Sequence, residues 1–275
     1  MASRIRSDTR HVSRRVTPWV AITVCMLSVS ALSKDVESGT ALAARYRQDV
    51  TRRLDLPPDE QAQYEGHLAN ALAASGLASL PAQYVVLIDR SVFVQAVMIF
   101  WKSDSGAFEF IGASPTSTGK PGRFEHFETP TGVFAHTLEN PDFRAEGTLN
   151  EEGIRGYGRR GMRVYDFGWV PVAKGWGNRQ QSVMRLQMHA TDPDRLESRL
   201  GSVQSKGCIR IPASLNTFID RFAILDAAYD RARRDGRSFW VLSPEREPTP
   251  WSGEYLVVIE TVRSGRPAWS PPPRF

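Results

Sequence analysis

Cysteine is nearly absent from this sequence: its 275 residues include two, Cys25 and Cys208. So small a number excludes a disulfide scaffold, and it excludes a metal cluster held by several thiolates. Histidine is also scarce, with five in the chain, and no spacing typical of a metal site occurs. No carboxylate pair stands out for glycoside hydrolysis. We therefore expect neither a metal nor an organic cofactor.

A strong excess of one charge is missing from most of the chain. The formal net charge is +5, but residues 1–33 contain five arginines and one aspartate, a net of +4, which leaves +1 for the rest. Binding to phosphate backbones needs concentrated basic charge on the folded domain. The composition therefore argues against nucleic acid as a partner.

Long uncharged hydrophobic runs are limited to one place near the N-terminus. Residues 18–32, PWVAITVCMLSVSAL, follow an arginine-rich lead. Their length is typical of a secretory signal and short of the roughly 20 residues of a spanning helix. We expect residues 1–33 to be a signal peptide, with an N-terminal membrane anchor as the competing interpretation. Cleavage would remove Cys25 and leave Cys208 unpaired in an oxidising compartment, which suggests a reactive thiol.

The pattern along the chain predicts a mainly β fold with flanking helices. Residues 34–80 are expected to be a helical lead-in, since prolines and Asp59 precede apolar residues at helical spacing and Gly76 follows them. From Tyr84 on, runs rich in Val, Ile and Phe predict a hairpin over residues 84–102. Further strands are expected within residues 107–119, 129–139 and 182–190.

The second half of the chain contains one predicted long helix, over residues 213–235, where apolar residues recur at helical spacing. Residues 238–244 and 254–262 are expected to be closing strands. Residues 265–275 are rich in proline and are expected to be disordered. These assignments place the main domain at residues 82–245 and a C-terminal strand with a proline-rich tail at residues 246–275.

The most informative stretch is SVQSKGCIRIP, residues 202–212, where Cys208 follows polar residues and Gly207. A cysteine nucleophile needs a base and donors for the developing oxyanion. His189 ends a predicted strand, and the polar connection can fold back to bring its imidazole to the sulfur. Gly207 allows backbone N–H groups to approach a substrate closely. A helix that begins near residue 213, together with Lys206, would favour the thiolate if both face the sulfur.

Other side chains have a functional interpretation and a simpler one. His136 ends a strand and could face the site, but a core or surface histidine is the simpler interpretation. His126 lies in a loop that could cover a substrate. Tyr157, Trp169 and Trp176 could line a groove, but aromatic packing is the simpler interpretation.

The residues around Cys208 resemble the signature of the L,D-transpeptidase (YkuD-type) catalytic domain family. That signature is a histidine, a gap of about fifteen residues, then Ser/Thr-His-Gly-Cys, an apolar residue and Asn or Arg. Here the gap covers residues 190–204, and Ser-Lys-Gly-Cys-Ile-Arg follows it. Upstream, STG at residues 117–119 and TPTGVF at residues 129–134 resemble elements that precede the site in the same family. The resemblance covers residues 82–245.

The resemblance implies an L,D-transpeptidase-like β-sandwich and a cysteine-dependent peptidoglycan L,D-transpeptidase in the periplasm or cell envelope of a bacterium. Cys208 would attack the stem tetrapeptide at position three and release D-alanine, with His189 as general base. Backbone N–H groups of Gly207 and Cys208 would hold the oxyanion. An amine would then resolve the thioester into a cross-link. The implied partners are stem peptides, with a cell-envelope protein as an alternative acceptor, and the residues implied for substrate binding are Arg210, Ser205 and Lys206.

Two departures from the family pattern bear on activity. Lys206 stands where the family has a histidine, and Ala190 stands where a glycine commonly follows the base, so its methyl group is expected to narrow the cleft. The residues leave open an L,D-carboxypeptidase, in which water replaces the amine, and a non-catalytic muropeptide-binding module. Papain-like and sortase-like peptidases are disfavoured by the order and spacing of His189 and Cys208.

Overall fold

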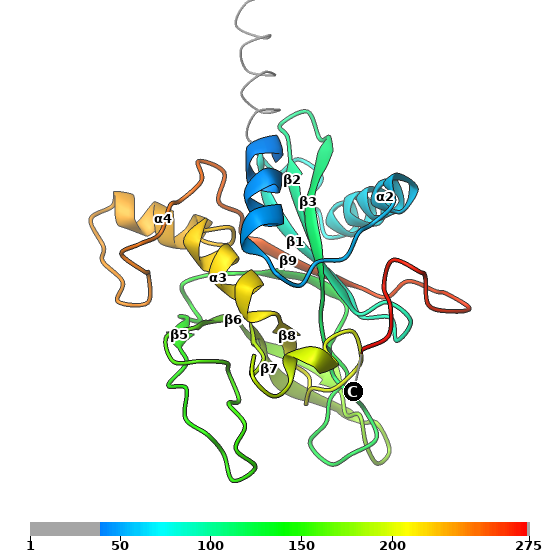
Figure 1. Cartoon of the computed structure of the whole chain (residues 1–275). Helices are drawn as coiled ribbons and strands as arrows, with labels where there is room; N and C mark the ends of the chain where they lie inside the picture. Colours follow the sequence, from blue (N-terminus) through cyan, green and yellow to red (C-terminus); the bar gives the residue numbers. More distant parts are fainter. Residues whose placement is uncertain (1–38, 274–275) are drawn as a thin grey trace, which may run out of the picture. The chain divides into compact units, whose positions relative to one another are not determined.

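Strands dominate the structure, a computed structural model that describes residues 39–273 (Figure 1). The leader expected at residues 1–33 lies outside the described residues. The helices are a stretch over residues 39–49, α2 (Pro58–Ala74), the 3-10 turn η1 (Glu197–Arg199), α3 (Ala213–Arg221) and α4 (Ala227–Arg234). The strands are β1 (Gln83–Asp89), β2 (Ala96–Lys102), β3 (Phe108–Pro115), β4 (Gly132–Ala135), β5 (Phe143–Arg144), β6 (Arg163–Ala173), β7 (Gln181–Ala190), β8 (Ile209–Ile211) and β9 (Tyr255–Ile259). The expectation of a mainly β fold with flanking helices is confirmed.

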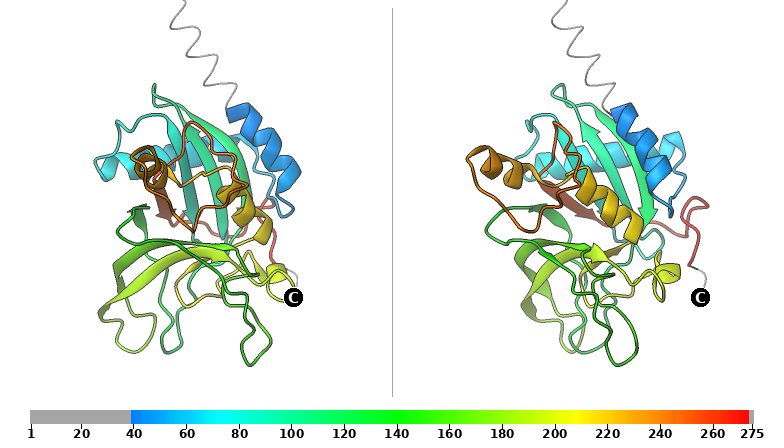
Figure 2. Two further views of the ribbon diagram at one scale, coloured as in Figure 1. Left: turned by 90° about the vertical axis from the view of Figure 1, so that its left-hand side faces the viewer. Right: turned by 60° about the vertical axis from the view of Figure 1, so that its left-hand side comes forward.

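The strands form two sheets. The first has five strands in the order β3-β2-β1-β9-β4, and the second has four in the order β5-β6-β7-β8. Most neighbours are antiparallel, but β1 pairs with β9 and β7 pairs with β8 in parallel. Figure 2 shows the sheets one above the other, with α3 and α4 beside them. The parallel pair β7 and β8 is the part of the fold that carries the candidate site.

The core consists of two hydrophobic clusters on opposite faces of the first sheet. All seven residues of β1 are buried, as in a strand covered on both sides. Val86 and Ile88 point toward the second sheet and α3, and Val85 and Leu87 point toward α2. One of these clusters packs side chains of both sheets against each other. Only the other face of the second sheet therefore remains available for a functional site.

Helix α2 forms for the reasons visible in its sequence. Pro58 stands at the helix start, and Asp59 and Glu60 lie in the first turn, where negative charge complements the helix dipole. Tyr64, Leu68 and Leu72 recur every four residues and are all buried. The helix therefore packs one face on the first sheet.

The single helix expected over residues 213–235 is wrong: α3 and α4 are separate helices. Ala223, in the connection between them, has a φ of 55°, outside the helical range. The break buries Ile224 and Leu225 completely and lets Asp226 pair with Arg163 at 2.7 Å. The strand expected over residues 238–244 is also absent, since turns occupy that segment.

The disorder expected for the proline-rich tail is contradicted as far as residue 273. Trp269 is 8% exposed and its ring meets the ring of Tyr64 edge to face, with centroids 6.0 Å apart. The hydroxyl of Ser270 donates to the carbonyl of Val94 at 2.6 Å. The tail therefore packs on the outer side of the first sheet and on α2.

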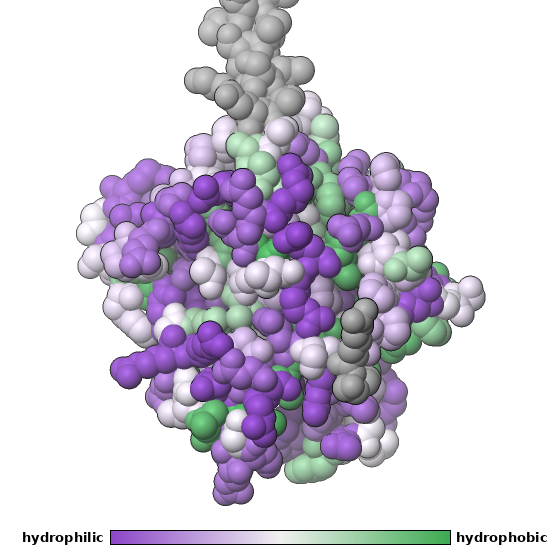
Figure 3. Space-filling view, viewed as in Figure 1, coloured by the Kyte–Doolittle hydropathy of each residue, from purple (hydrophilic) through white to green (hydrophobic). Residues whose placement is uncertain are grey.

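The face shown in Figure 3 is mostly hydrophilic, with hydrophobic residues in small separate patches. Within residues 39–273, no helix combines the length and the apolar character needed to cross a bilayer.

Candidate active site

Two neighbouring strands carry the cysteine and histidine singled out in the sequence. In the parallel pair of β7 and β8, His189 lies directly opposite Arg210, and Met188 lies opposite Ile209. Met188 and Ile209 belong to the core between the sheets, so the alternation along each strand turns His189, Arg210 and Cys208 to the other face. With strands about 4.8 Å apart, the Cα atoms of His189 and Cys208 are on the order of 8 Å apart. The strand register thus brings both residues onto one surface.

A tight turn over residues 205–207 delivers Cys208 to the start of β8. The Ser205 hydroxyl donates to the Cys208 carbonyl at 2.5 Å and accepts the N–H of Gly207 at 3.0 Å. Gly207 has a φ of 134°, and a Cβ there would lie 2.8 Å from Met184, so this position requires glycine. Ser205 therefore orders the turn. The N–H of Gly207 is engaged within it, which differs from the free oxyanion donor expected from the sequence.

The two upstream motifs pack directly on this turn. Gly119 pairs with Ser205 in a parallel bridge. The Thr129 hydroxyl accepts the N–H of Gly119 at 2.9 Å and donates to the carbonyl of Gly207 at 2.6 Å. A Cβ on Gly119 would lie 2.0 Å from the carbonyl oxygen of Phe127, so the chains approach too closely for any side chain. Residues 117–119 and 129 therefore hold the cysteine turn in place.

His189 is held as a neutral imidazole. Its Nδ1 lies 2.7 Å from the carbonyl oxygen of Ala190, which can only accept, so Nδ1 carries the proton and Nε2 keeps its lone pair. The pKa of His189 is lowered to about 4, mainly by burial and to a smaller extent by the charge of Arg210, while the hydrogen bond to the Ala190 carbonyl opposes both. The ring of Tyr157 meets the imidazole at 4.7 Å between centroids and an angle of 70°. At neutral pH Nε2 is therefore able to accept a proton.

Cys208 is partly exposed and is held as a thiol. Burial of the sulfur raises its pKa, while the charge of Arg210 and the backbone N–H of Gln187 lower it. Both residues are described, and no hydrogen bond joins the Cys208 sulfur to the His189 imidazole. Proton transfer therefore requires Nε2 and the sulfur to approach each other, as catalytic groups often do when substrate binds.

Arg210 places a cation next to both reactive groups. Its charge lowers the pKa of Cys208 and that of His189. Its backbone is fixed by an antiparallel bridge to Ser117 and by the hydroxyl of Thr116, which donates to the Arg210 carbonyl at 2.8 Å. The guanidinium makes no ion pair with a carboxylate among residues 39–273. A half-buried guanidinium without a counter-ion can bind a carboxylate at this surface.

A chain of polar side chains continues across the same face. The Tyr157 hydroxyl donates to Gln187 Oε1 at 3.3 Å, Gln187 Nε2 donates to Asp166 Oδ2 at 2.8 Å, and Arg185 Nε lies 2.7 Å from the same oxygen. Sequence reasoning missed Gln187, Arg185 and Asp166. The signal was present for two of them, because Gln187 and Arg185 precede His189 by two and four residues and so share its face of a strand.

Lys206 and the N-terminus of α3, both expected to act on the Cys208 sulfur, interact with other groups instead. The Lys206 side chain is 67% exposed and lies 3.7 Å from Glu125. Helix α3 begins only after β8, and its first N–H, that of Ala213, donates to Glu197 Oε1 at 2.6 Å. The helix dipole therefore acts on Glu197, and neither group favours a thiolate at Cys208.

Two further residues of the sequence analysis are structural. His136 is fully buried, with Nε2 2.7 Å from Asp142 and Nδ1 2.6 Å from the Leu225 carbonyl, so it belongs to the core. Ala190 is also fully buried. Its methyl group therefore does not narrow a substrate cleft, which corrects that expectation.

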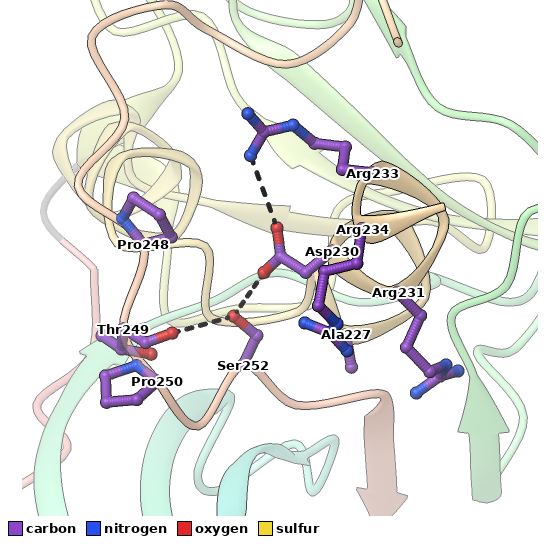
Figure 4. Close-up of a pocket in the computed structure, with 9 residues that line it drawn as sticks. All are labelled: Ala227, Asp230, Arg231, Arg233, Arg234, Pro248, Thr249, Pro250 and Ser252. Carbon is purple, nitrogen blue, oxygen red and sulfur yellow. Dashed lines mark hydrogen bonds and ion pairs between the residues drawn. The ribbon is translucent and has the colours of Figure 1, made fainter. Parts of the chain in front are cut away.

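Other parts of the described chain offer no competing centre. Within it, no group of three or more His, Cys, Asp and Glu side chains could hold a metal ion. A cavity of about 610 Å³ lies beside α4, where Asp230 faces Ser252 and Arg233 (Figure 4). It is lined by Ala227, Asp230, Arg231, Arg233, Arg234, Pro248, Thr249, Pro250 and Ser252. It contains neither a nucleophilic thiol nor a histidine, so it cannot carry the chemistry of the cysteine site.

Comparison with known proteins gives a weak fold similarity. No protein-family model matches the chain, and no curated protein matches it. Among solved structures, it is similar to the helical cell shape determining protein Pgp2 from Campylobacter jejuni, with a TM-score of 0.34 and 14% identity over 67% of this chain and 50% of that one. A point mutant of Pgp2 gives a TM-score of 0.34 and 11% identity, over 83% and 57%. The chain thus spans about half the length of the structures that it matches.

Proposed function

We propose that this protein is an exported, cysteine-dependent L,D-transpeptidase with an L,D-transpeptidase-like β-sandwich fold, which acts on peptidoglycan stem peptides. The observation that carries the proposal is the register of β7 and β8, which sets His189 and Arg210 side by side and Cys208 next to them. The signature over residues 189–210 supports the same chemistry. Export rests on the leader at residues 1–33, and the protein then works in the periplasm or cell envelope of a bacterium.

The first half of the reaction forms a thioester. Nε2 of His189 takes the proton of the Cys208 thiol as the sulfur attacks the carbonyl carbon of the third stem residue. A carbon–sulfur bond forms, and the carbonyl oxygen becomes an oxyanion. When the intermediate collapses, the carbon–nitrogen bond to the terminal D-alanine breaks, and His189 returns the proton to the leaving amine.

The second half releases the acyl group. An amine from another stem peptide, or from an envelope protein, attacks the thioester and loses a proton to His189. The new amide bond forms as the thiolate leaves, and the imidazolium restores the thiol. In both halves of the reaction, the oxyanion accepts a hydrogen bond from the backbone N–H of Cys208. The N–H of Gly207 becomes a second donor when it releases its hydrogen bond to the Ser205 hydroxyl. Water in place of the amine would give carboxypeptidase activity.

Charge at the site selects the substrate. Arg210 binds a carboxylate of the stem peptide, which removes the cost of leaving its guanidinium without a counter-ion. Ser205 keeps the cysteine turn in shape. Lys206, whose exposed ammonium lies 3.7 Å from Glu125, offers a second cation to a carboxylate of the acceptor stem peptide.

The test combines labelling with turnover. The purified protein is incubated with a carbapenem, and the Cys208 adduct is read by intact mass. The same protein is given a tetrapeptide muropeptide, and products are read by mass spectrometry. Cys208→Ala is expected to abolish the adduct and turnover while its thermal unfolding stays unchanged.

Each outcome has a distinct meaning. Turnover that survives in Cys208→Ala rules out the mechanism. A wild-type protein that forms no adduct and turns over nothing, but still binds the muropeptide in a calorimetric titration, is a muropeptide-binding module. A cross-linked dimer indicates a transpeptidase, and a tripeptide alone indicates a carboxypeptidase.

A further inference from the structure

A second cavity, of about 460 Å³, opens next to the candidate active site. It lies between residues 143–148 and 156–158 and the side chain of Trp240. Its walls include three aromatic rings, those of Phe143, Tyr157 and Trp240, and three polar side chains, those of Arg144, Glu146 and Thr148. Trp240 is 75% exposed, an unusual position for so large an apolar side chain. Its ring is therefore available to a ligand.

Tyr157 connects this cavity to the reactive groups. Its ring contacts the imidazole of His189, with 4.7 Å between centroids, and also contacts the ring of Phe143, with 5.4 Å between centroids. The wall of the cavity formed by Phe143 is thus no more than about 10 Å from the imidazole. A ligand in the cavity and a carbonyl at Cys208 can belong to one molecule.

We propose that the cavity binds a sugar ring of the glycan to which the stem peptide is attached. This inference rests on the proposed function. Aromatic rings can cover the C–H face of a sugar, and the rim side chains Glu146 and Thr148 can hydrogen-bond its hydroxyl groups. The carbonyl under attack belongs to the third stem residue, so three residues of backbone separate it from the sugar. Each residue spans at most about 3.3–3.6 Å, which places the sugar on the order of 10 Å from that carbonyl.

The experiment compares two ligands that differ only in the sugar. A Cys208→Ala protein, which cannot turn over substrate, is titrated calorimetrically with a disaccharide-tetrapeptide and with the free tetrapeptide. We expect the disaccharide form to bind about 10-fold more tightly. Adding Trp240→Ala should bring the two affinities to within about 2-fold of each other. Trp169→Ala is the matched control, since Trp169 is 67% exposed on β6 and does not line the cavity; it should keep the difference.

The results separate this inference from the proposed function. Equal binding of both ligands, or a preference that survives Trp240→Ala, overturns the sugar site and leaves the cysteine chemistry untouched. A free tetrapeptide whose own binding falls on Trp240→Ala shows that the cavity takes a peptide side chain, which also overturns it. A Trp240-dependent preference for the sugar, together with a wild-type protein whose Cys208 forms no carbapenem adduct, supports the sugar site and contradicts the enzyme.

Discussion

At the scale of single residues, the reactive groups of the site rest in their neutral forms. Burial lowers the pKa of His189 and raises that of Cys208, so proton transfer between them produces an ion pair where none existed. Arg210 favours the thiolate and disfavours the imidazolium. In the proposed mechanism, a substrate carboxylate that neutralises Arg210 would ease protonation of His189, so binding and chemistry would be linked through one side chain.

The neutral state of His189 makes stability depend on pH. Its folded pKa of about 4 lies below its ordinary value of 6.5, so the unfolded chain binds the proton first as the pH falls. As the pH falls from about 6.5 to about 4, the free energy of unfolding is expected to decrease by about 3 kcal/mol because of His189. His189→Gln removes the titration, so urea unfolding across this range should show a flatter profile.

The comparison between the wild-type protein and His189→Gln isolates the effect of His189 on stability. The pKa of His136 is also shifted: burial opposes protonation, but the nearby Asp142 carboxylate outweighs it and raises the pKa. Because His136 is present in both the wild type and the variant, its contribution to the pH dependence cancels in the comparison. Parallel stability curves for wild type and His189→Gln would show that the imidazole is not buried as described.

At the scale of elements, the site depends on segments that lie far apart in the chain. Gly119 is the point of closest approach, because a Cβ there would lie 2.0 Å from the Phe127 carbonyl oxygen and 2.9 Å from the Thr129 nitrogen. Both neighbours are backbone atoms that cannot rotate away. Gly119→Ala is expected to cost about 3 kcal/mol of stability and to abolish the carbapenem adduct.

Gly66→Ala is the control for this substitution. Gly66 lies inside α2, and a Cβ there meets nothing within 4 Å. The change should leave labelling intact and stabilise the protein by about 0.5–1 kcal/mol in urea unfolding. Normal adduct formation in Gly119→Ala would show that the cysteine turn does not depend on the contact with residues 117–119.

At the scale of the whole molecule, the C-terminal segment completes the fold. Trp269 covers Tyr64 of α2, and Ser270 bonds the loop before β2. Trp269→Ala is expected to cost about 3 kcal/mol because the ring is nearly fully buried. Trp169→Ala, at an exposed position, should change the unfolding free energy by no more than about 0.5 kcal/mol. Equal thermal unfolding midpoints for the two variants would contradict this role of the tail.

The sequence predicted what depends on local patterns and missed what depends on distant partners. The hairpin of β1 and β2 follows from continuous apolar runs around a polar break. The break between α3 and α4 does not, because it serves the pairing of Asp226 with Arg163, which lies 63 residues earlier. The packed tail and the engaged N–H of Gly207 were missed for the same reason. Composition indicated disorder for the tail, and the family resemblance implied an oxyanion donor at Gly207.

The position of β9 in the first sheet has a consequence for how the chain folds. β9 lies between β1 and β4, although it follows them by more than 100 residues. Until it arrives, β1 has an unpaired backbone edge and β4 has no neighbour at all in that sheet. An incompletely synthesised chain is thus open to strands from other molecules, so aggregation and strand exchange between copies are the hazards to watch during expression.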